Sequence, residues 1–234
     1  MSDSVPVINP KEHLVTMKPL RLMGLTLIAA CVMAGAASAS ASAALPEFLK
    51  TGPTLTGTSG ASTLETKSGT KVTCTAGKNT GTITGVKTVS KIVVTFTGCK
   101  SSGFACKTPT AASGELITTE LTGTLGYTNT AKKEVGVKLA PTAGGKFIEF
   151  ECVGGIIKVQ VTGSVIGALT PVNTLSTKST LTFKQTKGVQ ALTKFEGEKE
   201  ESFLKTSIGG GAAEQSGQES TSALVTSEAD EVKA

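Results

Sequence analysis

Threonine recurs at every second position in many short segments of this sequence. Examples are Thr82-Ile-Thr84, Thr95-Phe-Thr97 and Thr180-Leu-Thr182, and residues 44–234 contain 35 threonines. A two-residue period places alternate side chains on opposite faces of a strand, and β-branched residues pack well on a pleated surface. The pattern therefore predicts many short strands, each with one buried and one solvated face.

Clusters of Gly, Ser, Asn and Pro separate these segments, and no segment after residue 44 has convincing helical periodicity. The predicted strands are residues 62–67, 70–76, 80–85, 90–98, 114–119, 121–127, 134–139, 146–153, 156–163, 177–185 and 189–195. Closely spaced short strands are typical of antiparallel sandwiches and barrels. We therefore expect an all-β fold, either an antiparallel β-sandwich or a partly open barrel.

Two parts of the sequence echo each other. Each has a cysteine near a strand end, a glycine eleven residues later and, farther on, a strand that begins with Lys and ends with Thr-Phe. The positions are Cys74, Gly85 and Lys91–Phe96 in one part and Cys152, Gly163 and Lys178–Phe183 in the other. Repeated patterns of this kind indicate two related hairpin units. A shared strand pattern without duplication is the alternative.

Residues 17–44 have the pattern of a secretory signal peptide. A basic start with Lys18 and Arg21 precedes an apolar run, which ends in overlapping A-x-A sequences up to Ala43. We expect a signal helix here and cleavage near Ala43, and hence a protein that is secreted or held in the cell envelope of a bacterium.

Residues 1–16 have no place in a signal peptide, so we expect an over-extended start and translation from Met17. An uncleaved membrane anchor is a weaker alternative, because a span needs about 20 strongly apolar residues and this run is short and rich in Ala, Gly and Ser. Lipidation of Cys31 is a third possibility, although the sequence after it stays apolar.

The β domain is expected to span residues 45–208. The remaining residues, 209–234, begin with a hinge-like run of three glycines and are acidic and rich in Gly and Ser, which predicts edge strands or a loosely attached tail. A cluster of acidic residues just before them is interpreted as a solvated turn. Its members are Glu196, Glu198, Glu200 and Glu201.

The chain after Ala43 lacks two residue types that many functions require. The only His and the only Arg are His13 and Arg21, and Asp230 is the sole Asp that follows. Catalytic Ser-His or Cys-His pairs and imidazole zinc ligands are therefore excluded there, as are Asp-rich calcium loops. This part carries 20 Lys and 16 acidic residues, a balance that does not indicate nucleic-acid binding. We expect no metal and no cofactor.

Catalytic motifs are weak, and we expect no enzyme. S-x-x-K occurs at Ser68–Lys71 and Ser202–Lys205, and K-T-G at Lys50–Gly52. In penicillin-recognising enzymes K-T-G lies downstream of a helical S-x-x-K, and here the order is reversed and the context is β. Glu149 and Glu151 could suggest a glycosidase, but their spacing in a strand predicts an exposed face instead.

Four cysteines follow the predicted signal: Cys74, Cys99, Cys106 and Cys152. An even number in an exported protein indicates disulfides, and three pairings are possible. We expect Cys99–Cys106, worth about 2.5 kcal/mol by loop entropy, and Cys74–Cys152, worth about 4.5 kcal/mol on the same model.

Four stretches carry a family resemblance: VVTFTGCKSSGFAC (93–106), GELITTELTGTLGY (114–127), FECVGG (150–155) and VTGSVIG (161–167). They resemble a family of exported, multi-copy uncharacterised proteins from soil actinobacteria, and the similarity extends over nearly the whole chain after the signal. The cysteine positions and the L-x-G-x-L-G-Y pattern around Tyr127 are its specific part. The resemblance implies secretion and a β fold, and it implies no activity.

The leading hypothesis is a secreted non-enzymatic β protein, structural or adhesive at the cell envelope. The alternative is an extracellular module that binds carbohydrate or cell-wall polymer, although aromatic residues are few. No other partner is indicated; nucleic acid is not expected, and a membrane only through an uncleaved signal or lipidated Cys31. Two narrower hypotheses are an ice-binding threonine array and a Lys–Asn isopeptide bond, with Asn79, Asn129 or Asn173 as acceptor.

Overall fold

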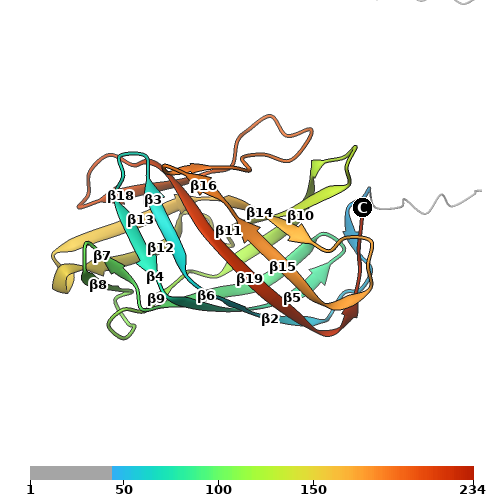
Figure 1. The fold of residues 1–234 in the computed structure, drawn as a ribbon, viewed down its shortest axis with the longest axis horizontal. Coiled ribbons are helices and arrows are strands. Elements are labelled where there is room, and N and C mark those ends of the chain that lie inside the picture. The colour runs from blue at the N-terminus through green and yellow to red at the C-terminus, as the bar shows by residue number, and fades with distance from the viewer. Residues whose placement is uncertain (1–43) are drawn as a thin grey trace, which may run out of the picture. The chain divides into compact units, whose positions relative to one another are not determined.

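The computed structural model describes residues 44–234, which form twenty strands and one short 3-10 helix, η1 (Val153–Gly155) (Figure 1). The prediction of an all-β, antiparallel fold is confirmed. The expected over-extended start, the signal helix and Cys31 lie outside the described residues.

Eight strands pair in a closed antiparallel ring, which we call the first barrel. In order around the ring they are β15 (Ser176–Phe183), β14 (Val165–Thr170), β11 (Glu134–Pro141), β10 (Leu121–Asn129), β6 (Thr88–Thr97), β5 (Ala76–Gly85), β2 (Thr54–Ser59) and β19 (Glu214–Asp230). Pairing of β19 with β15 closes the ring, so this barrel has no edge strand.

The same strand β19 also belongs to a second ring of antiparallel pairings, the second barrel. After β19 its members are β18 (Leu204–Ile208), β13 (Ile157–Gly163), β12 (Lys146–Cys152), β8 (Phe104–Lys107), β7 (Lys100–Ser101), β4 (Lys71–Cys74) and β3 (Ser62–Thr66). Pairing of β3 with β19 closes it. Short elements complete the fold: β1 (Glu47–Phe48) with β20 (Val232–Lys233), β9 (Leu116–Ile117) on β6, and β16 (Gln185–Thr186) with β17 (Val189–Gln190).

The two barrels are joined end to end. Several consecutive strands pass from one to the other, namely β2 to β3, β4 to β5, β6 to β7 and β13 to β14. The interior is shared at the junction, where Phe96, Thr118, Phe147 and Gln218 line cavities on both sides. The two barrels therefore form one continuous core.

The prediction of edge strands or a loose tail at the C-terminus is wrong, because the long strand β19 has partner strands on both sides. Residues 216–219 of β19 pair with β3 in the second barrel, and residues 222–226 pair with β2 in the first. This strand runs diagonally across the molecule in Figure 1. The polar composition of β19 suggests exposure to solvent, but Ser216, Ser220 and Ser222 are buried. Their small hydroxyl side chains fit the interior.

Where the alternation is strong, the predicted faces are confirmed. In β12, Ile148, Phe150 and Cys152 are buried, whereas Glu149 is exposed and Glu151 is half-buried. Both glutamates lie near lysines, with Glu149 paired to Lys146 in the same strand. The interpretation of these carboxylates as an outward face is thus confirmed.

The strands close into barrels, which differs from the expected sandwich or partly open barrel, so only the all-β antiparallel part of that prediction is confirmed. The two copies of the internal echo are divided between the barrels: their cysteine strands, β4 and β12, lie in the second barrel, whereas their Thr-Phe strands, β6 and β15, lie in the first. The two copies therefore do not form two separate halves. Strands outside the predicted ranges include β2, β7, β8 and β14.

Candidate functional site

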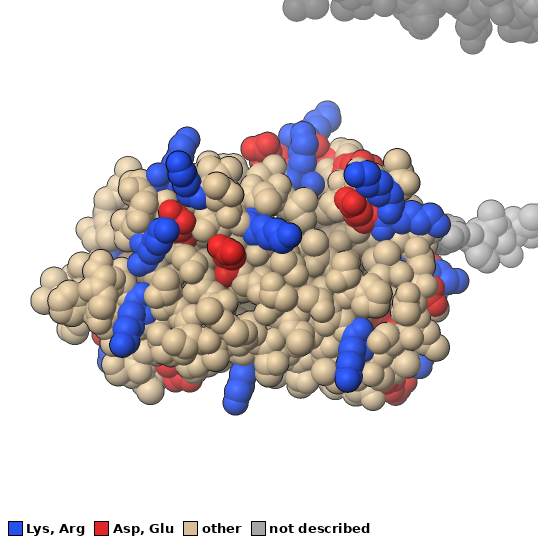
Figure 2. All heavy atoms as spheres, viewed as in Figure 1, with Lys and Arg blue, Asp and Glu red and all other residues tan. Residues whose placement is uncertain are grey.

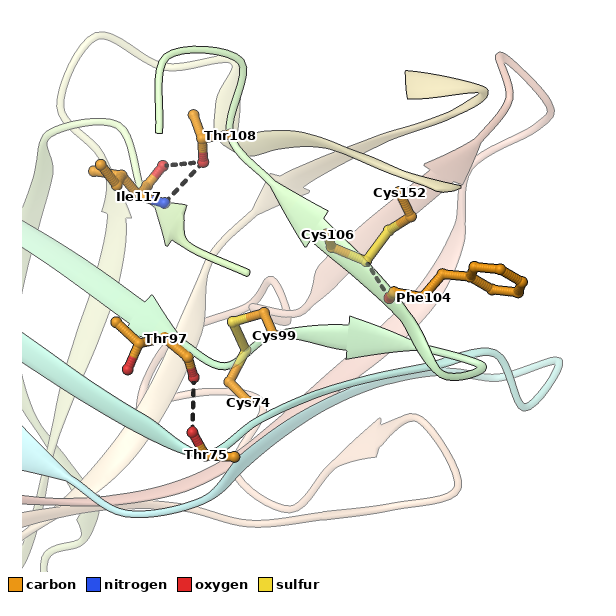
Figure 3. The surroundings of a disulfide bond; sticks show 9 residues. All are labelled: Cys74, Thr75, Thr97, Cys99, Phe104, Cys106, Thr108, Ile117 and Cys152. Atoms are coloured by element: carbon orange, nitrogen blue, oxygen red, sulfur yellow. Dashed lines mark hydrogen bonds between the residues drawn. A yellow bond between two sulfur atoms is a disulfide. The ribbon is translucent and has the colours of Figure 1, made fainter. Parts of the chain in front are cut away.

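All four cysteines in residues 44–234 form disulfides, but the pairing differs from the prediction. Cys74 bonds to Cys99 and Cys106 bonds to Cys152 (Figure 3). The expected pairs, Cys99–Cys106 and Cys74–Cys152, are wrong because sequence proximity does not decide which strands are neighbours. Cys106 lies directly opposite Cys152 where β8 pairs with β12, so these two side chains meet across the ladder.

The Cys106–Cys152 bond borders a cavity of about 320 Å³ at the end of the second barrel away from the first. We call it the end cavity. Volumes of about 300–1,000 Å³ are typical of small-molecule sites. Its lining comes from the strands of the second barrel and the turns that join them: Leu64, Thr66, Thr70, Val72, Ser101, Ser102, Phe104, Cys152, Val153, Ile157, Val159, Thr206 and Ile208.

Large apolar side chains are exposed where the end cavity meets the surface. Phe104, in the β7–β8 hairpin, is 55% exposed, and Ile157, at the start of β13, is 38% exposed. Figure 3 shows the Phe104 ring projecting from its hairpin beside the two disulfides. The neighbouring Ile156 is 80% exposed. Exposed apolar groups around a concave surface often mark a binding site.

The polar side chains of the end cavity are hydroxyls, and three of the five already have partners. Thr66 Oγ1 accepts the Thr70 N–H at 3.1 Å, and Ser101 Oγ donates to the Lys71 carbonyl at 2.9 Å. Thr206 Oγ1 lies 2.7 Å from Ser216 Oγ. None of the lining side chains is charged at neutral pH. The arrangement can hold a neutral, mainly apolar molecule, and its lining supplies no acid or base.

The serine and lysine of the first S-x-x-K motif, Ser68 and Lys71, each contact a carboxylate. Ser68 lies in the β3–β4 turn, where its Oγ donates to Glu214 Oε1 at 2.6 Å and its N–H donates to Oε2 at 2.8 Å. The hydroxyl hydrogen bond lowers the pKa of the Glu214 carboxyl below its ordinary value. Lys71 Nζ lies 3.4 Å from Glu65 Oε1 instead. Ser68 and Lys71 are thus held by different carboxylates.

The asparagines of the isopeptide hypothesis have different environments. Asn129 Oδ1 accepts the Lys132 N–H within a turn, whereas Asn173 Oδ1 accepts the Ala234 N–H and so links the β14–β15 turn to the residue after β20. Asn79 lines the interior of the first barrel. No hydrogen bond between residues 44 and 234 joins a lysine amine to any of these side chains.

The threonine array is present on the outer surface of the first barrel. Thr56 and Thr54 of β2 lie directly opposite Thr80 and Thr82 of β5. Three of them are exposed and Thr82 is half-buried. The expected register of hydroxyls on neighbouring strands is therefore confirmed, on a sheet that closes into a barrel.

Charged side chains are scattered over the face shown in Figure 2, with neutral stretches between them. In residues 44–234 no group of three or more His, Cys, Asp or Glu side chains has the arrangement of a metal site. The same part of the chain contains no helix of the length and apolarity needed to cross a membrane.

Comparisons of the chain with protein-family models, with curated proteins and with solved structures found no match. The functional inference below therefore rests on the geometry of the end cavity.

Proposed function

We propose that this protein is an extracellular, non-enzymatic binding protein that holds a small neutral apolar molecule in the end cavity. The supporting observation is the 320 Å³ volume of this cavity, lined by uncharged side chains and bordered by the exposed ring of Phe104. Two disulfides support an oxidising compartment, in keeping with the predicted export signal.

A binding role without chemistry fits the lining. The hydroxyls of Thr66, Ser101 and Thr206 are engaged in hydrogen bonds within the protein, and Cys152 is oxidised in a disulfide. Burial of an apolar ligand here would remove Phe104 and Ile157 from water, which contributes roughly 25 cal/mol for each Å² of apolar surface buried. The ligand class is therefore apolar and without net charge.

The neutral fluorescent probe N-phenyl-1-naphthylamine tests this proposal. We expect its emission to rise on titration with the protein, and the Phe104→Glu variant to weaken binding because the ligand would have to lie beside a charge. Leu175→Glu is the matched control, since Leu175 is 63% exposed and lies outside the cavity lining. Absence of saturable binding, or equal binding by Phe104→Glu, would contradict the proposal.

A structural or adhesive role is the second candidate, and the threonine rows of β2 and β5 favour it. Retention of the protein on insoluble polysaccharide or cell wall would support it. Thr56→Lys with Thr80→Lys should then abolish retention without affecting probe binding in the end cavity, which separates the two candidates.

A further inference from the structure

The first barrel contains a second cavity, which we call the barrel cavity. Its volume is about 100 Å³, and it lies among side chains of β5, β6, β11, β14, β15 and β19. Most of its lining is apolar, including Ile83, Val89, Leu139 and Leu181. An engineered apolar cavity of about 150 Å³ holds benzene, so this one suits a molecule of about five heavy atoms.

The end of the first barrel distant from the second is covered by β1 and β20. Phe48 N–H donates to the Val86 carbonyl in the β5–β6 turn, and Asn173 N–H donates to the Val232 carbonyl from the β14–β15 turn. The β1–β20 pair therefore spans this end of the barrel, and Phe48 and Val232 both line the cavity beneath it.

Asp230 lies at this covered end and also lines the barrel cavity. It is 7% exposed, and it is the only aspartate after residue 43. Its Oδ1 accepts the Lys50 N–H at 3.0 Å. Its Oδ2 is buried, and no residue between 44 and 234 gives it a hydrogen bond.

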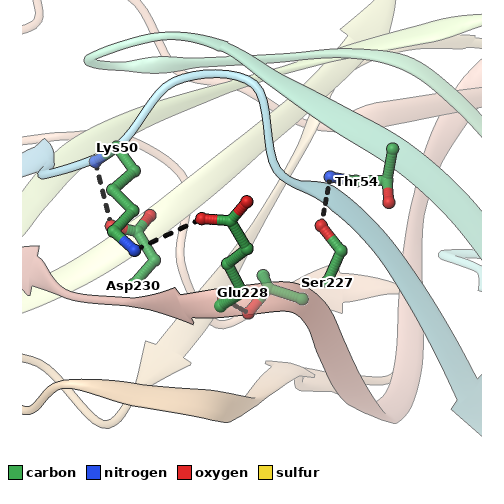
Figure 4. Close-up of polar contacts among 6 residues, drawn as sticks. Lys50, Thr54, Ser227, Glu228 and Asp230 are labelled. Carbon is green, nitrogen blue, oxygen red and sulfur yellow. Dashed lines mark hydrogen bonds and ion pairs between the residues drawn. The ribbon is translucent and has the colours of Figure 1, made fainter.

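The lysine beside Asp230 does not neutralise it. Figure 4 shows the Lys50 amine turned to Glu228, and the distance from Nζ to Oε2 is 3.4 Å. Lys178 also lines the barrel cavity, but it is exposed, and no lysine among residues 44–234 forms an ion pair with Asp230. An isolated buried carboxylate is costly unless a donor, above all a charged one, meets it.

We propose that the barrel cavity binds a small aliphatic ammonium ion. The ammonium group donates to Asp230 Oδ2 and supplies the missing positive charge, and the short alkyl chain lies among the apolar side chains of the barrel. Exposed Thr174 and Thr177 in and next to the β14–β15 turn line the same cavity, which gives the ligand a route from the surface.

The probe is n-butylammonium, titrated into the purified protein and followed by amide chemical shifts. We expect saturable shifts at β1, β15 and the end of β19, and binding that is about tenfold or more weaker in Asp230→Asn. This variant keeps an oxygen for the Lys50 N–H, so it should fold. Glu228→Gln is the matched control because it removes a neighbouring carboxylate whose side chain is 66% exposed.

A neutral analogue and a variant at the end cavity complete the test. 1-Butanol has nearly the same shape without the charge, and it should bind at least several-fold more weakly than n-butylammonium. Equal binding of the two compounds, unchanged binding by Asp230→Asn, or no binding of the amine would each overturn the proposal. Phe104→Glu should leave amine binding unchanged, so a failure of the end cavity to bind its probe is distinguishable from a failure here.

Discussion

The ring of Phe195 lies directly over Gly126 on the outer surface of the first barrel. A Cβ added to Gly126 would lie 2.2 Å from Phe195 Cδ2, so only glycine allows this contact. Phe195 is buried although it lies outside any strand. The second glycine of the L-x-G-x-L-G-Y pattern therefore leaves space for the Phe195 ring, which comes from a loop distant in sequence.

We expect Gly126→Ala to lower the free energy of unfolding by about 2 kcal/mol, because overpacking of a tight contact typically costs about 1–3 kcal/mol. Urea denaturation measures the effect. Gly60→Ala is the control, since nothing lies within 4 Å of its added Cβ. If steric conflict is the cause, Gly126→Ala should cost much less in a Phe195→Ala background; simple additivity of the two changes would contradict this explanation.

The disulfide pairing is directly testable by tryptic mapping without reduction. Cleavage after lysine places Cys74 in residues 72–78, Cys99 in 92–100, Cys106 in 101–107 and Cys152 in 147–158. The structure requires 72–78 linked to 92–100, and 101–107 linked to 147–158. A linked pair of 92–100 and 101–107 would instead show the pairing expected from sequence proximity.

Removal of Cys106–Cys152 by a double change to alanine should lower stability by about 4 kcal/mol on the loop-entropy model, given the sequence separation of 46 residues. The change should also reduce binding of the neutral probe, because Cys152 lines the end cavity. Removal of Cys74–Cys99 is the comparison. Its loop of 25 residues predicts a loss of about 3.5 kcal/mol, and neither cysteine lines the end cavity.

Glu198 holds the loop that carries Phe195. Burial alone raises the pKa of Glu198, but hydrogen bonds from Lys138 Nζ and the Phe195 N–H, with the charge of Lys138, lower the pKa below its ordinary value overall. A depressed pKa in the folded state means that this stabilisation is present above the unfolded pKa and is lost as pH falls through the folded pKa.

We therefore expect Glu198→Gln to reduce stability at pH 7 by about 1 kcal/mol or less, a value limited by solvent screening of a partly exposed pair. The difference from wild type should shrink as the solution is acidified, which urea denaturation at several pH values measures. Glu200→Gln, at an exposed position in the same loop, is the control. A difference that stays constant down to acid pH would contradict the assignment.

Much of the fold could be predicted from the two-residue period of Thr and Val. Strands such as β3, β4, β12 and β13 appear where alternation was strong, because burial of one face dictates it. The central place of β19 differs from the expected edge strands or loose tail, because its inward residues include Ser216, Ser220 and Ser222, which carry no apolar signal. Barrel closure likewise cannot be predicted from this period, since it depends on pairing between strands that are distant in sequence.

The candidate sites were less visible in the sequence. The four cysteines were identified but not their partners, because Cys106 and Cys152 become neighbours only through the β8–β12 pairing. The sequence predicts a solvated turn for the acidic cluster, whereas in the structure Glu196 accepts the Thr130 N–H and Glu198 pairs with Lys138. For Asp230 the sequence shows only that it is the one aspartate after residue 43. The cavity that it lines cannot be predicted from the alternation of residues along the strands.

The hydroxyls of Thr206 and Ser216 form a buried pair that links β18 to β19, with their oxygens 2.7 Å apart. Thr206→Val keeps the side-chain volume but leaves the Ser216 hydroxyl without its partner, so we expect a loss of about 1–3 kcal/mol. Ser216→Ala should have a similar effect on Thr206.

The double variant Thr206→Val with Ser216→Ala should be more stable than the sum of the single losses predicts, because no unpartnered hydroxyl remains. Urea denaturation of the four proteins measures this coupling. Strict additivity would mean that the two hydroxyls do not depend on each other.

β19 closes both barrels, so its removal should prevent folding altogether. A chain that ends at Ile208 opens both rings and leaves β2, β3, β15 and β18 each with one unpaired edge. We expect loss of the cooperative unfolding transition and of dispersed amide signals. Deletion of residues 232–234 is the control, because it removes only β20 and should give a folded, less stable protein. A cooperative transition in the chain that ends at Ile208 would restore the interpretation of residues 209–234 as a dispensable tail.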